Sequence, residues 1–201
     1  MTDKKTTVNR AILVTGGVAA LALVILGIFN QSSYSSIVAA AIVWSLASLS
    51  MIALGIAFIH IRRVFETPAA YLASAVLFIK AVLVVIPLFV EYADAEVMQV
   101  IRSAIDILFM AATAWVMYCG RPLLGGIVSR LIAAMLTIAS LGLIAKFIVA
   151  WWSIISWQSC VESALVNWAV ILSTLLGTGG MGASFIWLGV RRGEGAPADA
   201  A

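Results

Sequence analysis

The chain has 201 residues, of which 64% are hydrophobic and 10% are charged, with a formal net charge of +3. A soluble domain normally carries about 25% charged residues, so this composition excludes an ordinary soluble protein and predicts a chain embedded in a lipid bilayer. The basic residues occur singly or in pairs and form no stripe, which argues against nucleic acid as a partner.

Six apolar runs follow one another along the chain, each long enough for the roughly 20 helical residues that cross a bilayer. They cover residues 11–29, 37–61, 69–90, 99–119, 127–150 and 163–190. The runs are continuous rather than alternating, and backbone polar groups in lipid must be paired within the segment, so each run predicts a helix. The connections are short and the tail 193–201 is small and polar. We therefore expect one all-α transmembrane domain over 1–201, with a disordered tail.

The charges at the ends of the runs predict the orientation. With a cytoplasmic N-terminus, the inner side receives the basic residues Lys4, Lys5, Arg10, Arg62, Arg63, Arg121, Arg130, Arg191 and Arg192. The outer side receives the acidic residues Glu91, Asp94, Glu96 and Glu162. The positive-inside rule thus predicts a multi-pass protein of the cell (inner) membrane, with six spans and both termini in the cytoplasm. We expect the tryptophan-rich segment 151–159 to lie along the outer surface.

A lysine interrupts the third run near its middle. Lys80 would lie about 15 Å from either end of the predicted helix, further than the roughly 6 Å that a lysine side chain reaches. Asp106, the only acidic residue inside a predicted span, lies in the next run, which should pack antiparallel to the third. We predict that these charges belong to a polar cluster in the outer half of the bundle, made of Lys80, Arg102, Asp106, Lys146, Glu162 and Asn167. The cluster would either be structural, fixing helix register or docking a partner subunit, or form a site for an ion, a proton or an anionic substrate.

The sixth run contains "GTGGMG" at 177–182, which formally matches a dinucleotide-binding fingerprint. That fingerprint requires a preceding strand and a βαβ unit, whereas this stretch lies inside an apolar helix. The glycines form a patch of small residues, which predicts close helix packing, at Gly177, Gly179, Gly180 and Gly182. The alternative is a helix that is interrupted there to form a transport site.

No set of catalytic, metal-binding or cofactor-binding residues can be recognised in the sequence. The single histidine, His60, lies beside two arginines at the inner end of the second run, which is typical of an interfacial residue. We therefore expect a protein that is not an enzyme and has neither a metal nor a cofactor.

The predicted function is that of a non-catalytic subunit or scaffold of a larger membrane complex. Its partners would be the bilayer and other membrane subunits or further copies of the chain. The alternative is a small transporter, or a substrate-capturing transport component, for an ion or small solute. A membrane enzyme is the least favoured class, because no nucleophile, metal set or pair of acids is present at matching depth.

Overall fold

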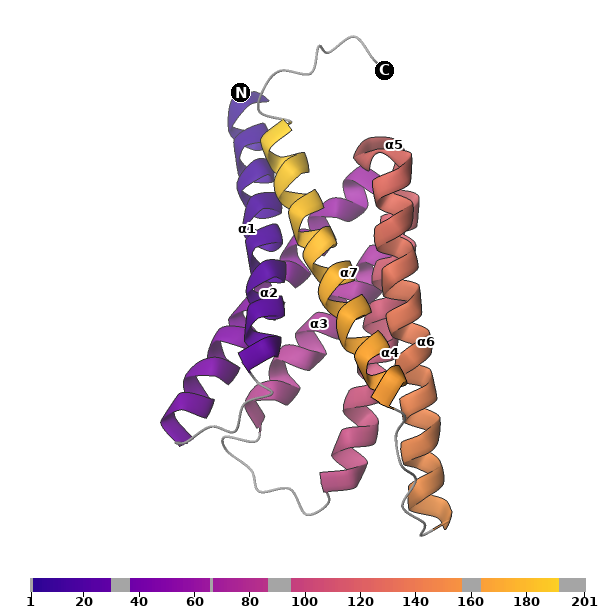
Figure 1. Cartoon of the computed structure of the whole chain (residues 1–201). Helices are drawn as coiled ribbons and strands as arrows, with labels where there is room; N and C mark the ends of the chain where they lie inside the picture. The colour runs from indigo at the N-terminus through magenta and orange to yellow at the C-terminus, as the bar shows by residue number, and fades with distance from the viewer. Residues whose placement is uncertain (1, 30–36, 66, 87–94, 157–163, 192–201) are drawn as a thin grey trace.

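A computed structural model describes residues 2–29, 37–65, 67–86, 95–156 and 164–191 (Figure 1). These residues form helices and no strand, which confirms the all-α prediction. The helices are α1 (Thr2–Phe29), α2 (Ile37–Phe65), α3 (Ala69–Val85), α4 (Ala95–Cys119), α5 (Arg121–Leu124), α6 (Gly126–Ser156) and α7 (Ala164–Arg191). The tail 193–201 lies outside the described residues.

The helices are compatible with a membrane-embedded protein. Among the described residues, α1, α2, α4, α6 and α7 are long and apolar enough to cross a membrane. α3 is also apolar but has 17 residues, fewer than the predicted span of 69–90, and residues 87–90 lie outside the described part of the chain. The sixth span and the orientation therefore stay predictions.

The outward faces of these helices are apolar. Large side chains that point away from the bundle include Leu49, which is 62% exposed, Ile127, which is 78% exposed, and Leu165, which is 82% exposed. Such residues recur along the whole length of the long helices. A water-soluble bundle would place polar residues there, so these faces suit contact with lipid.

α6 is longer than its predicted span. It continues through Ser156, so the prediction that 151–159 lies along the surface is wrong for residues 151–156, while 157–159 are not described. No glycine or proline interrupts the chain between Gly142 and Ser156, so nothing ends the backbone hydrogen bonding at the predicted boundary. The rings of Phe147 and Trp151, one helical turn apart, stack with centroids 6.4 Å apart.

The six longer helices form a closed ring. Each packs against two neighbours, in the order α1, α2, α3, α4, α6, α7 and back to α1. The short helix α5 joins α4 to α6, and the turn ends at Gly125, whose φ of 84° lies in the left-handed region that favours glycine. In Figure 1 the N-terminus, α5 and the end of α7 all lie at the upper end.

The packed core occupies the upper half of this ring. Fully buried side chains come from the start of α1, the end of α2, the end of α4, the start of α6 and the end of α7: Leu13, Phe58, Met117, Leu136 and Phe185. The ring of Phe58 makes edge contacts with Phe109, at 6.3 Å between centroids, and with Phe185, at 5.5 Å. Three helices therefore meet through aromatic rings at the centre of the bundle.

The glycine-rich stretch of α7 lies within an uninterrupted helix, so the alternative of a broken helix is not what the structure contains. A Cβ on Gly177 or Gly180 would lie 2.8–2.9 Å from side-chain atoms of Leu136 or Ile132 on α6. A Cβ on Gly182 would lie 2.8 Å from the carbonyl oxygen of Gly17 on α1. These three glycines allow close helix contacts, whereas a Cβ on Gly179 would meet nothing within 4 Å.

Candidate functional site: a pocket with charged residues inside the helical ring

The lower half of the ring contains a pocket of about 660 Å³. The lining residues fall within 23–27 of α1, 43–51 of α2, 77–84 of α3, 102–110 of α4 and 174–178 of α7. α1 and α3 end in this half, and α2, α4 and α7 begin in it. The pocket thus lies at the opposite end of the bundle from the packed core.

Helical periodicity turns the charged side chains towards this pocket. On α3, Leu77, Lys80 and Val84 follow at intervals of three and four residues and share one face. On α4, Arg102 and Asp106 are four residues apart and lie on the face that lines the pocket. The packing of α3 against α4 then brings the two charged faces together.

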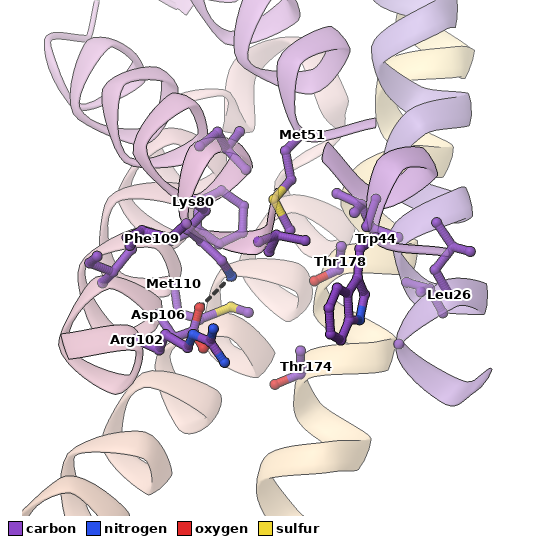
Figure 2. A pocket seen from close by; sticks show the side chains of 18 of the residues that line it. Leu26, Trp44, Met51, Lys80, Arg102, Asp106, Phe109, Met110, Thr174 and Thr178 are labelled. Atoms are coloured by element: carbon purple, nitrogen blue, oxygen red, sulfur yellow. Dashed lines mark hydrogen bonds and ion pairs between the residues drawn. The ribbon is translucent and has the colours of Figure 1, made fainter. Parts of the chain in front are cut away.

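An ion pair joins these two helices at the pocket wall. The ammonium group of Lys80 donates a hydrogen bond to the carboxylate of Asp106 (Figure 2). Their side chains are 22% and 34% exposed, so both border open space, and the Lys80 nitrogen also lies 5.6 Å from the centre of the Phe109 ring. Each charge thereby has an opposite charge beside it in an otherwise apolar environment.

Arg102 adds a further positive charge to the pocket. Within the described residues Arg102 forms no salt bridge with an acidic side chain, and Arg102 is itself exposed. Two cations and one anion leave the pocket with a formal charge of +1 from these three residues.

The remaining walls are different in character. α1 and α2 contribute apolar and aromatic side chains, including Leu26, Trp44 and Met51, while α7 contributes the hydroxyls of Thr174 and Thr178. Figure 2 shows the charged residues on one side of the pocket and Trp44 with Leu26 on the other. The pocket is therefore amphipathic.

Among the described residues, the members of the predicted polar cluster lie in two groups, one at the pocket and one between α6 and α7. Lys146 of α6 donates a hydrogen bond of 2.6 Å to the side-chain oxygen of Asn167 on α7, and neither residue lines the pocket. Glu162 lies outside the described residues. The predicted cluster rests only on the similar depth of these side chains in the membrane. In the ring, α4 lies between α3 and α6, so similar depth alone does not bring Lys146 to Lys80.

No pattern in the sequence marks Thr174, Thr178 and Trp44 as part of a site. The two threonines are one helical turn apart just before and within the glycine patch, which is the only local signal that they share a face. Trp44 lies in a uniformly apolar run, where no pattern distinguishes a residue that faces a pocket from one that faces lipid. Among the described residues, no three His, Cys, Asp or Glu side chains form a group that could hold a metal ion.

Comparison with known proteins gives no further indication of function, since no family model, no curated protein and no solved structure matches this chain.

Proposed function

We propose that this protein is a membrane-embedded solute-capturing component, which holds a small solute in the pocket between α1, α2, α3, α4 and α7. The observation that carries the proposal is the pocket of about 660 Å³ with the Lys80–Asp106 ion pair and Arg102 on its wall. Binding sites for small molecules are typically about 300–1,000 Å³, mostly apolar, with a few polar groups that orient the ligand. This pocket has both properties.

The closed end of the bundle favours capture over conduction through an open channel. Phe109 borders the pocket and makes an edge contact with Phe58, which in turn contacts Phe185. These rings are at most 4% exposed, so side chains fill the ring of helices beyond the pocket. A solute in the pocket could therefore pass through the bundle only after these side chains rearrange, or after a partner binds.

A role as a subunit is compatible with this proposal. A capture component of this kind would hand its solute to another membrane subunit or to a second copy of the chain. The sequence-based expectation of a non-catalytic subunit or scaffold therefore stays a prediction. Nothing in the pocket supports an enzymatic role over a binding role.

Binding can be tested by thermal unfolding of the purified chain in lipid nanodiscs, in the presence of a panel of small carboxylates, phosphates, amines and neutral solutes. A true ligand at about 100 times its Kd should stabilise the fold by about 2.7 kcal/mol, which is a shift of about 5–10 °C in Tm for a chain of this size.

The matched variants for this test are Gly27→Leu and Gly179→Leu. A Cβ at either glycine meets nothing within 4 Å, but only Gly27 lines the pocket. Leucine at Gly27 should occupy part of the pocket and abolish the ligand-induced shift, while leucine at Gly179 should preserve it. Equal shifts in both variants would show that the ligand binds elsewhere.

The proposed location is the cell (inner) membrane, with both termini in the cytoplasm and the pocket in the outer half. In a chain with Cys119→Ser and Cys160→Ser, we expect Asp94→Cys to react with a membrane-impermeant maleimide in intact cells. Ala201→Cys should react only after the cells are opened. Labelling of Ala201→Cys in intact cells would reverse the proposed orientation.

A further inference from the structure

We infer that the solute is an amphipathic monoanion, with its acidic group at Arg102 and Lys80 and its apolar body against α1 and α2. This inference rests on the proposed function and names the chemical class of the ligand. It follows from the charge balance of the pocket and from the separation of its charged and apolar walls.

The charge balance disfavours a cationic solute. Among the described residues, Asp106 is the only acidic one that lines the pocket, and it already accepts a hydrogen bond from Lys80. A cation would have to compete with Lys80 for this carboxylate, and it would also meet the positive charge of Arg102. Whichever of the two, the bound cation or Lys80, lost this competition would be left without an opposite charge in an apolar environment, which is costly.

An anion would complete the pairing on this wall. The guanidinium of Arg102 has five N–H donors in a planar fork, which suits two oxygens of one acidic group. Lys80 lies beside Asp106, and its ammonium has three donors, of which the carboxylate occupies one. One negative charge on the solute would neutralise the pocket, whereas several would exceed its formal charge of +1.

The opposite wall requires an apolar body. Every residue that α1 and α2 contribute is apolar or aromatic: Leu23, Val24, Leu26, Gly27, Val43, Trp44, Ala47 and Met51. A small inorganic anion would leave this wall uncovered, while an amphipathic molecule would bury apolar surface there at about 25 cal/mol per Å². The hydroxyls of Thr174 and Thr178 lie on the α7 wall, where they can bond polar atoms near the middle of the solute.

The test uses three photoreactive probes that share one medium-length alkyl chain and differ only in their head group, which is a carboxylate, a hydroxyl or a trimethylammonium. The full chain is reconstituted in phosphatidylcholine nanodiscs, and labelling of the pocket-lining peptides is followed by mass spectrometry. We expect the carboxylate probe to reach half-saturation at a concentration at least about tenfold lower than the alcohol, and the ammonium probe to bind most weakly.

Arginine variants examine the basis of this preference. Arg102→Gln should reduce the preference for the carboxylate to near parity, and Arg102→Lys, which keeps the charge, should retain most of it. Arg130, an exposed arginine of α6 that does not line the pocket, supplies the control variant Arg130→Gln, which should behave as the unmodified chain does. Thermal unfolding of each variant checks that the fold is retained.

The possible failures are distinguishable. If the three probes saturate the pocket equally, or the ammonium probe binds best, the inference of an anionic ligand is wrong while the binding pocket stands. If no probe labels the pocket saturably and Gly27→Leu changes nothing, the proposed function fails as well.

A second set of nanodiscs that contain phosphatidylglycerol identifies the source of the anion. Competition by this lipid would support the inferred chemistry with an anionic lipid as ligand, and lack of competition would support it with a free solute.

Discussion

Replacing Gly17 with leucine is expected to destabilise the bundle by about 3 kcal/mol or more, the largest effect that the structure predicts. A Cβ at this position would lie 2.6 Å from the carbonyl oxygen of Gly182 and 2.9 Å from the backbone nitrogen of Ile186. These are backbone atoms of α7, which cannot rotate away as a side chain can. The two helices would have to separate, and this contact also closes the ring between its first and last helices. Thermal unfolding in nanodiscs measures the loss of stability.

Gly179→Leu is the matched control for this prediction. It makes the same substitution within α7, where a Cβ meets nothing within 4 Å, and we expect a change of less than about 1 kcal/mol. Equal destabilisation by the two variants would mean that a general effect of leucine, and not the close contact of α1 with α7, explains the result.

Breaking the ion pair between Lys80 and Asp106 is expected to have the second largest effect. Either Lys80→Met or Asp106→Leu alone should cost about 2 kcal/mol, because each leaves one charge without its partner in a mostly apolar environment. The double variant should recover most of this loss, since it removes both charges together. A double-mutant cycle on thermal unfolding gives the coupling energy between the two side chains.

The same cycle distinguishes a structural ion pair from one that also belongs to the binding site. If the double variant is stable but no longer responds to a ligand of the unmodified chain, the charges serve the site as well as the fold. If it retains the ligand response, the pair is structural only. Additive losses in the two single variants would contradict the energetic importance of the pair.

Several features of the fold could be predicted from the sequence because they depend on local pattern and on the cost of exposing polar groups to lipid. The long apolar runs identify the helices, since each predicted run overlaps one of the helices α1, α2, α3, α4, α6 and α7. The boundary near residue 150 could not be predicted from hydropathy. Helix termination depends on glycine, proline and capping residues, and none of these interrupts α6 there.

The candidate site was partly predictable. Lys80 and Asp106 lie on consecutive runs in the same half of the bundle, and consecutive helices with a short connection are usually neighbours, so their contact follows from the order of the chain. Lys146 satisfied the same criterion of depth, yet it contacts Asn167 on α7. Depth is a property of a residue in its own helix, whereas contact also requires knowledge of which helices are adjacent.

Composition, run length and end charges by themselves determine that the chain is helical, that its outer faces suit lipid and that a few costly charges lie within its helices. Only the tertiary structure decides the order of the helices around the ring, the glycine contacts that close it and the pocket left in one half. The physical reason is that these helices are apolar on nearly every face, so hydrophobicity does not specify which face packs inward. Shape does so instead, through glycines such as Gly17 and Gly182, which let two backbones approach closely.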